Sequence, residues 1–161
     1  MKEILPACEG LPERRFCAGE VLLREGDDGV ALFVLIEGDV SVCKGTVEVA
    51  RAREPGALFG EMSALLGQPY SASVVARGDV RTFEVPDGRA FLAEHPAVAL
   101  HTARLLAQRL HDATTYLADL KAQFGDRSDH FGMVDRILDA LLQSQLAKGA
   151  GSEERSDDPR L

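Results

Sequence analysis

Short apolar runs separated by turn sequences fill the chain from residue 16 to residue 85. Two of the runs, Leu32–Ile36 and Val40–Val42, are rich in β-branched and aromatic side chains and have the length of ordinary strands. The breaks between runs combine glycine with charged residues or proline: Gly26–Gly29, Glu37–Asp39, Lys44–Thr46, Pro55–Gly56 and Gly78–Asp79. Regular spacing of this kind predicts an antiparallel β-sandwich or barrel.

The pattern changes after Pro86, and a long helix is predicted from Pro96 to Phe124, a stretch with no internal glycine or proline. Apolar residues there recur at alternating steps of three and four: Ala103, Leu106, Leu110, Ala113, Leu117, Leu120 and Phe124. This seven-residue repeat keeps one seam on one side of the helix, and it predicts a homodimer through the Ala99–Phe124 helix. The alternative is a stripe that packs on the barrel of its own chain.

The chain beyond Gly125 is predicted to hold a linker, one short helix and a tail. Asp129 is a suitable N-cap for a helix that runs to about residue 147. Residues 148–161 are rich in glycine, serine and acids and are predicted to be disordered. The expected organisation is a domain over residues 1–124, a helical segment over 125–147 and a tail over 148–161.

Composition narrows the function classes. At 161 residues the chain suits one compact domain, and its formal net charge of −8 opposes nucleic-acid binding because no local basic stripe offsets it. No stretch approaches the roughly 18 apolar residues of a membrane span, and the first residues lack the apolar core of a secretory signal. We therefore expect a cytoplasmic protein that contacts no membrane.

The most informative segment is Phe59–Val74, with the sequence FGEMSALLGQPYSASV. It combines a glycine, a carboxylate, one short helical turn and a run of small residues, which suits it to cradle a sugar phosphate in backbone N–H groups. This segment resembles the phosphate-binding cassette of cyclic-nucleotide-binding domains. We call Phe59–Val74 the cassette from here on.

The resemblance covers roughly Phe16–Phe124 and rests on three parts in order. The first is a set of turns, Ala18–Val21, Glu25–Asp27 and Glu37–Val40; the second is the cassette, and the third is the long helix. The resemblance implies a mainly β protein with helices, in which a double-stranded β-helix or jelly roll precedes a long C-terminal helix. It also implies cAMP or cGMP as the ligand. We expect no cofactor and no metal.

The resemblance further assigns roles within the cassette. Gly60 and Met62 would present backbone amides to the ligand, Glu61 would accept a hydrogen bond from the ribose 2′-hydroxyl, and Ser71 and Ala72 would contact the cyclic phosphate. A buried carboxylate is a good acceptor for a hydroxyl, and a glycine lets the backbone approach the ligand closely. The alternative for Glu61 is a carboxylate that stabilises the start of a helix.

Tyr70 departs from the family pattern, because it stands where the family has an arginine on the cyclic phosphate. A neutral phenol replaces a charged, bidentate fork, so affinity for a cyclic monophosphate is expected to fall by at least roughly ten- to hundredfold relative to an arginine-bearing site. Ser71, Ser73 and Arg77 are nearby residues that could compensate. The alternative is that Tyr70 is a surface or packing aromatic beside a site that has lost its ligand.

Polar residues of the long helix reach the purine in the transcription-regulating relatives that the chain resembles. Thr114 and Thr115 are the candidates here, next to the seam residue Ala113. The alternative is that both threonines only face solvent.

Two hypotheses follow from these residues. The first is a stand-alone dimeric sensor of cyclic nucleotide, in which occupancy shifts the long helix. The second is a degenerate form of the same fold that binds nucleotide weakly or not at all and serves as a dimerisation or protein-interaction module, with another protein as its partner. Tyr70 is the residue that separates the two hypotheses.

Two further classes are disfavoured. A DNA reader would need a helix-turn-helix after the long helix, and residues 125–161 hold eight acids and five bases, a net charge of −3. An enzyme of the metal-dependent barrel type would place histidines on its strands. All four histidines lie in the helical half without tight ligand spacing: His95, His101, His111 and His130. We therefore expect no catalysis and no DNA partner.

Overall fold

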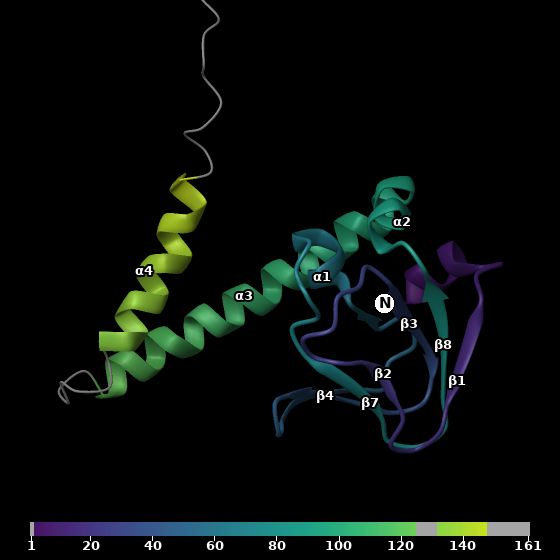
Figure 1. Cartoon of the computed structure of the whole chain (residues 1–161). Coiled ribbons are helices and arrows are strands. Elements are labelled where there is room, and N and C mark those ends of the chain that lie inside the picture. The colour runs from purple at the N-terminus through teal and green to yellow at the C-terminus, as the bar shows by residue number, and fades with distance from the viewer. Residues whose placement is uncertain (1, 125–131, 148–161) are drawn as a thin grey trace, which may run out of the picture. The chain divides into compact units, whose positions relative to one another are not determined.

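The computed structural model describes residues 2–124 and 132–147, and the chain divides into two compact units, Met1–Arg104 and Leu105–Leu161. The first unit contains the β-strands and the start of the long helix (Figure 1). The second contains the rest of that helix and a shorter one. The predicted linker at 126–129, its N-cap Asp129 and the predicted tail at 148–161 lie outside the described residues.

The first unit is an antiparallel β-structure made of two four-stranded sheets. One sheet has the order β1-β8-β3-β6 and the other has the order β2-β7-β4-β5. The strands are β1 (Glu13–Phe16), β2 (Val21–Leu23), β3 (Leu32–Glu37), β4 (Val40–Lys44), β5 (Val47–Ala52), β6 (Leu58–Phe59), β7 (Ser73–Ala76) and β8 (Val80–Val85). This arrangement confirms the antiparallel sandwich predicted from the turn spacing, and it is the jelly roll that the family resemblance implied.

Within the described residues, five helical elements accompany the strands: η1 (Lys2–Cys8), α1 (Glu61–Leu66), α2 (Gly88–Glu94), α3 (Pro96–Phe124) and α4 (Gly132–Ala147). Helix α3 has the bounds predicted from its uninterrupted apolar pattern. Helix α2 begins at the N-cap Asp87, whose side chain accepts a hydrogen bond from the Ala90 amide at 3.0 Å. The 3-10 helix η1 was not anticipated from the sequence.

Strand β3 contributes side chains to two buried clusters, one on each face of its sheet. Phe33 and Leu35 point into the space between the sheets, whereas Leu32 and Val34 belong to a second cluster on the outer face of their sheet. Residues two apart along a strand share a face, so a strand buried on both faces is apolar throughout. The run Leu32–Ile36 is therefore continuous rather than alternating.

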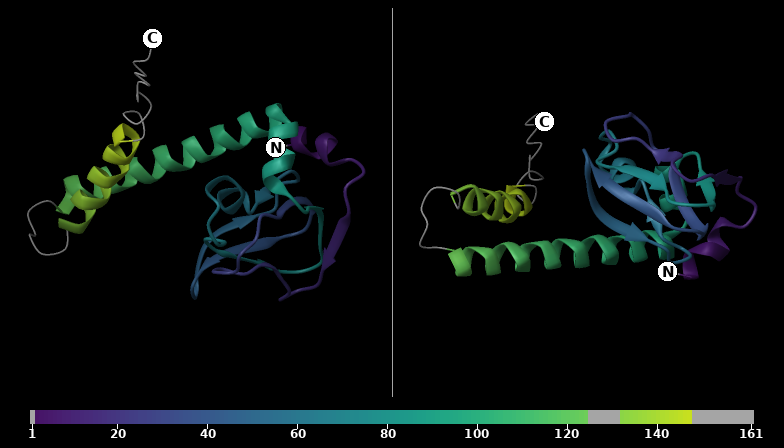
Figure 2. Two further views of the ribbon diagram at one scale, coloured as in Figure 1. Left: turned by 45° about the horizontal axis from the view of Figure 1, so that its top comes forward. Right: turned by 90° about the horizontal axis from the view of Figure 1, so that it is seen from below.

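The outer cluster joins η1, α2 and the first turns of α3 to the β1-β8-β3-β6 sheet (Figure 2). Its members outside the strands include Ile4, Cys8, Phe91, Leu92 and Val98, all of which are buried. Burial in this cluster raises the pKa of the Cys8 thiol to about 11. The cluster therefore ties the start of the chain to the start of the long helix.

The sheet register positions the cassette. Strand β6, which enters it, pairs with β3 through Phe33 and Phe59 and through Val34 and Leu58. Strand β7, which leaves it, belongs to the other sheet and pairs with β2 and β4. The cassette is therefore the crossing from one sheet to the other, and both of its ends are fixed by strand pairing.

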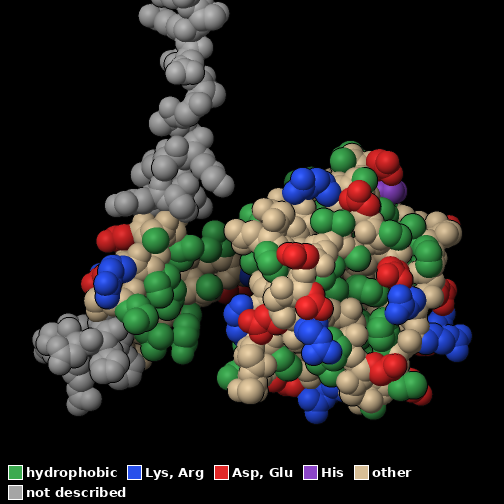
Figure 3. Space-filling view, in the orientation of Figure 1, with side chains coloured by type: hydrophobic (Ala, Val, Ile, Leu, Met, Phe, Trp, Pro, Cys, Tyr) green, Lys and Arg blue, Asp and Glu red, His purple; other side chains and the backbone are tan. Residues whose placement is uncertain are grey.

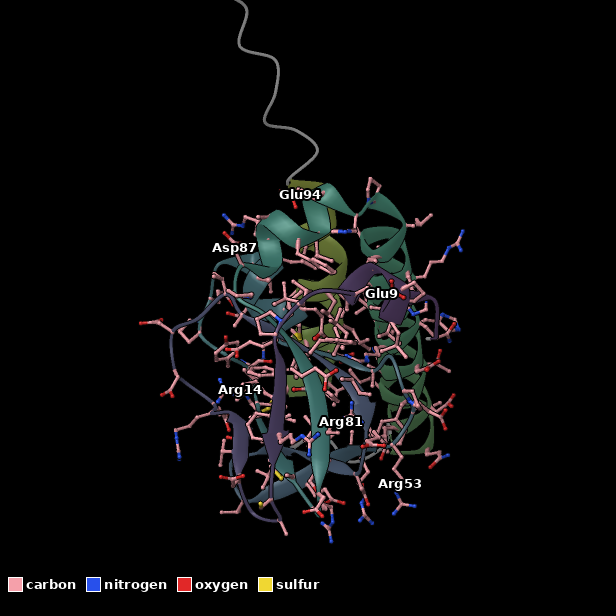
Figure 4. All side chains as sticks on the ribbon, turned by 90° about the vertical axis from the view of Figure 1, so that its right-hand side faces the viewer. Glu9, Arg14, Arg53, Arg81, Asp87 and Glu94 are labelled. Atoms are coloured by element: carbon pink, nitrogen blue, oxygen red, sulfur yellow. The ribbon has the colours of Figure 1, made fainter. Side chains whose placement is uncertain are left out.

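Charged side chains of both signs are interspersed over the first unit on the face that Figure 3 shows. Strands β1 and β8, where Figure 4 labels Arg14 and Arg81, illustrate the pattern. Arg14 pairs with Glu84 at 2.9 Å, and Arg81 pairs with Glu13 and Glu37 at 3.0 Å each. Such exposed pairs add little stability individually. In the described parts of the chain, no helix has the length and apolar character needed to cross a membrane.

The second unit carries most of the predicted seam. Leu110 is 40% exposed in the single chain, and Leu106, Leu117 and Leu120 are only partly buried. Lys121 on α3 forms an ion pair with Asp135 on α4, and the carboxylate raises the pKa of the lysine. The apolar seam therefore remains substantially open to solvent in one copy of the chain.

Candidate functional site

The cassette begins with a backbone conformation that only glycine adopts easily. Gly60 is the N-cap of α1 and has φ of 91°, in the left-handed region. A Cβ atom at this position would lie 2.6 Å from the Ala31 carbonyl oxygen. The glycine is therefore required for the β2–β3 loop to lie directly on the start of the cassette.

Glu61 follows as the first residue of α1 and is 5% exposed. A carboxylate is rarely buried this deeply unless it is hydrogen-bonded or paired. Met62, which the resemblance places next to it in the site, is 41% exposed. The helix thus turns its first carboxylate inward and its methionine outward.

Ser63 is a site residue that the sequence analysis missed. It is 2% exposed, and its hydroxyl lies within hydrogen-bonding distance of two backbone carbonyls, those of Gly29 and, at 2.6 Å, Gln68. The hydroxyl therefore fastens α1 to the β2–β3 loop and to the segment after α1. A serine two residues after the carboxylate was visible in the sequence, but its partners are brought to it only by the fold.

Tyr70 lies in the interior of the jelly roll. It is 8% exposed and belongs to the cluster of buried side chains between the sheets. Its hydroxyl donates a hydrogen bond to the Ala31 carbonyl at 3.2 Å, and its ring lies 3.4 Å from the position that a Cβ on Gly60 would take. The structure thus places Tyr70 as a packing aromatic of the interior, and the surface position that the sequence left open for it is wrong.

The backbone of Tyr70 is also bonded to the loop that follows β2. Its carbonyl accepts from the Gly26 amide at 2.9 Å, and its amide donates to the Asp27 carbonyl at 3.0 Å. Together with the hydroxyl bond to Ala31, these contacts join Tyr70 to three points of one loop. The predicted turn at Gly26–Gly29 is therefore part of the site.

The surroundings of the Tyr70 phenol raise its pKa. Burial is the main cause, and the negative charges of Asp27 and Glu84 act in the same direction. The phenol consequently remains protonated at neutral pH. It offers one neutral donor, and that donor is already directed at a backbone carbonyl.

The three residues proposed to compensate for the missing arginine are engaged in different ways. The Ser71 hydroxyl reaches the Met62 sulfur at 3.7 Å, and the Ser73 hydroxyl accepts from the Glu25 amide at 2.9 Å. Arg77 follows the last residue of β7, at the opposite end of the strand from Ser71. It donates hydrogen bonds to Glu48 at 2.8 Å and to Ser41 at 3.1 Å. Ala72, the other small residue at this end, is partly buried.

Lys44 is a basic residue near the cassette that the sequence did not single out. Its ammonium donates to the Ser71 carbonyl at 2.6 Å and pairs with Glu25 at 3.0 Å. Glu25 also accepts from the Gly45 amide at 2.7 Å, and this bond and Lys44 lower the pKa of the carboxylate. Only the register of β4 against β7, which sets Cys43 opposite Ser73, brings this hairpin to the end of the cassette.

Thr114 and Thr115 lie in the second unit. Thr114 is partly buried and donates to the Leu110 carbonyl of its own helix at 2.7 Å, as threonines in helices commonly do. Thr115 is exposed. Among the predicted residues, the structure therefore brings Tyr70 against Gly60, the residue before Glu61, and Ser71 next to Met62.

Comparison with known proteins identifies the family of the β-structure and its cassette. The family model described as "Cyclic nucleotide-binding domain" matches residues 13–93, which include all eight described strands and the whole cassette. The structure of the catabolite activator protein of Thermus thermophilus has a TM-score of 0.64 at 24% identity and covers 95% of this chain and 86% of that one. That likeness shows the shared fold.

Two curated relatives have sequence similarity over different lengths. A cAMP-dependent protein kinase regulatory subunit of Hypocrea atroviridis is 34% identical over 73 residues, which are 45% of this chain and 16% of that protein. A CRP-like cAMP-activated global transcriptional regulator of Mycobacterium tuberculosis is 28% identical over 145 residues, 86% of this chain and 60% of the relative. The chain thus spans 60% or less of the length of these two relatives. By its fold, its cassette and the family model over half its length, the chain belongs to the cyclic nucleotide-binding domain family.

Proposed function

We propose that this chain is a regulatory domain that binds a cyclic nucleotide, cAMP or cGMP, at the cassette and acts as a homodimer. The observation that carries the proposal is the start of the cassette, where a left-handed Gly60 is followed by the buried carboxylate of Glu61. Both named relatives are regulators whose names include cAMP, which supports a regulatory role rather than a catalytic one.

The proposed ligand contacts divide between sugar and phosphate. Glu61 accepts a hydrogen bond from a ribose hydroxyl, and the backbone at Gly60, Met62, Ser71 and Ala72 faces the cyclic phosphate. Without a guanidinium at position 70, the phosphate loses a charge-assisted contact worth on the order of 1.5–3 kcal/mol. The affinity expected is therefore roughly ten- to hundredfold below that of an arginine-bearing site.

Isothermal titration of the purified chain with cAMP and cGMP tests the proposal, with the linear 5′-monophosphates as controls. Saturable heat with a cyclic nucleotide supports it. The absence of heat up to high micromolar ligand contradicts it.

The proposed dimer forms through the seam on the Ala99–Phe124 helix, because exposed leucines at seven-residue spacing are stabilised by a matching helix. A glutamate in place of Leu110 or Leu117 should shift the protein to the monomer in sedimentation. Ala122→Glu is the matched control, since Ala122 is exposed and lies two residues from each neighbouring seam position. A single 17.4 kDa species of the unmodified chain at tens of micromolar would contradict the dimer.

One observation favours a second candidate, an interaction module with weak or no nucleotide binding. The Tyr70 side chain packs in the interior and bonds to Ala31, so the position of the charged contact is used for packing. In this case the chain would keep the fold and the dimer, and its partner would be another protein. The titration with cyclic nucleotide separates the two candidates.

A further inference from the structure

Tyr70 and Gly29 fit each other closely. A Cβ atom built on Gly29 would meet the hydroxyl oxygen and two ring carbons of Tyr70, all far inside van der Waals distance. These three Tyr70 atoms are its nearest neighbours. The ring therefore lies against the bare backbone of Gly29 and would not fit beside any other residue.

The opposite edge of the Tyr70 ring faces Gly60, near the start of the cassette. Gly60 lies beside the ring, because a Cβ atom built on it would be 3.4 Å from the Cε1 atom of Tyr70. Under the proposed function, the backbone of Gly60 comes close to the ligand. The buried cluster between the sheets supplies further contacts. The ring thus takes up the space between the β2–β3 loop and the first residue of the site.

We propose that the Tyr70 side chain is an internal plug of the cassette, received by Gly29, and that a cyclic nucleotide binds only when this side chain moves out. The part that concerns the ligand rests on the proposed function. The part that concerns the packing does not, since it describes the protein without a ligand.

The plug is coupled to the loop that it touches. Gly26, Asp27 and Ala31 are hydrogen-bonded to Tyr70, and Gly29 is bonded to Ser63 of α1. When the ring moves out, the hydrogen bond from the Tyr70 hydroxyl to Ala31 is broken and Gly29 loses its packing contact with the ring. Because the competent state is then only a fraction of the unliganded population, the apparent affinity is reduced by that fraction.

Tyrosine fluorescence reports on the plug directly. The chain has two tyrosines and no tryptophan, and Tyr116 is 64% exposed. In a Tyr116→Phe background, Tyr70 is therefore the sole emitter. We expect acrylamide to quench the emission of the ligand-free protein several-fold less than that of the unfolded protein. Efficient quenching in the ligand-free folded protein overturns the plug, whatever the ligand result.

Gly29→Ala in the same background tests the receiving residue. The φ angle of Gly29 lies outside the left-handed region, so alanine strains no backbone and acts only through its methyl group. We expect the ring to be expelled, with quenching raised several-fold. Gly78→Ala is the matched control, since a Cβ there meets nothing within 4 Å. Equal quenching in the two alanine variants overturns the role of Gly29.

Thermal melting provides a second readout if Gly29→Ala is too unstable for quenching. The loss in Tm caused by Gly29→Ala should disappear when Tyr70 is replaced by leucine in the same chain, because the methyl group then has no ring to meet. An undiminished loss in the double variant contradicts the pairing of the two residues.

Calorimetry and quenching with cAMP together separate the two proposals. Heat accompanied by increased quenching of Tyr70 supports both. Heat with unchanged quenching leaves the proposed function standing and overturns the plug. No heat with the unmodified chain, but heat with Gly29→Ala, contradicts the proposed function for the unmodified chain and supports a plug that closes the site. No heat with either overturns the proposed function and the ligand-dependent part of the plug, while ligand-free quenching still decides the packing.

Discussion

The two ends of the cassette differ in the role of their buried side chains. At the first end, the left-handed Gly60 is followed by the buried Glu61, the carboxylate proposed to hold a ribose hydroxyl. At the other end, Tyr70 faces the interior and bonds to the chain's own Ala31 carbonyl. The fold of the cassette therefore does not need a guanidinium at position 70, because packing and backbone hydrogen bonds hold both ends in place.

The largest expected effect comes from restoring charge at the second end. Tyr70→Arg should strengthen cAMP or cGMP binding tenfold or more, since a charge-assisted contact is worth on the order of 1.5–3 kcal/mol. Titration calorimetry measures it. Gln68→Arg is the control, because Gln68 is exposed and a cation there is screened by water. Unchanged or weaker affinity in Tyr70→Arg would mean that the cassette does not hold the ligand as proposed.

The link between the two ends depends on Ser63. Ser63→Ala removes a buried hydroxyl that lies beside the carbonyls of Gly29 and Gln68, and it should lower the free energy of unfolding by about 1–3 kcal/mol. Chemical denaturation measures the change. Ser71→Ala, at an exposed position in the same cassette, should change stability by less than about 0.5 kcal/mol. Equal losses in the two variants would show that Ser63 does not join the ends.

The first end is tested by making its carboxylate neutral. Glu61→Gln keeps the shape but weakens the proposed bond from the ribose hydroxyl, so cyclic-nucleotide affinity should fall about tenfold. Glu94→Gln, at an exposed position on α2, should leave the affinity unchanged (Figure 4). If Glu61→Gln binds as tightly as the unmodified chain, Glu61 stabilises the start of α1 and does not hold the ligand.

The smallest effect is a decline of stability in alkali. The folded state raises the pKa of Tyr70 above its ordinary value of about 10, so the folded state binds this proton more tightly than the unfolded state. The contribution is fully present below that ordinary pKa and is lost as the pH rises through the folded value. Cys8 behaves alike, with its pKa raised from 9.0 to about 11.

Two substitutions separate the contribution of Tyr70, in the interior, from that of Cys8, in the outer cluster, to the loss of folding stability at high pH. Tyr70→Phe should flatten the part that begins near the ordinary pKa of tyrosine, and Cys8→Ala should flatten the part that begins near that of a thiol. Denaturation at a series of alkaline pH values measures both. A slope that Tyr70→Phe leaves unchanged would mean that the phenol is not buried in solution.

Local patterns predicted the larger elements well. The turn glycines and the β-branched runs predicted the antiparallel structure, and the uninterrupted stretch from Pro96 to Phe124 predicted α3 with the bounds observed. The 3-10 helix η1 was missed because its formation depends on the burial of Ile4 and Cys8 against the sheet and α2. Such a contact has no counterpart in the local sequence.

The site was predicted less completely. Gly60, Glu61 and Tyr70 were singled out from the cassette sequence, and the structure packs the Tyr70 ring beside Gly60, while their role toward a ligand stays a prediction. Ser63 and Lys44 were not identified, since their partners lie far away in the chain. Arg77 was considered as a compensating cation because it is near in sequence, but β7 carries it away from Ser71 and it pairs with Glu48.

The sequence by itself determined the resemblance to the family, the succession of β-structure, cassette and long helix, and the absence of an arginine at position 70, because these depend on residue identity and short-range spacing. The tertiary structure alone decided where the phenol goes. Whether Tyr70 faced solvent or the interior depended on what lies opposite it, and the bare backbone of Gly29, some forty residues earlier in the chain, leaves the space in which the ring is buried.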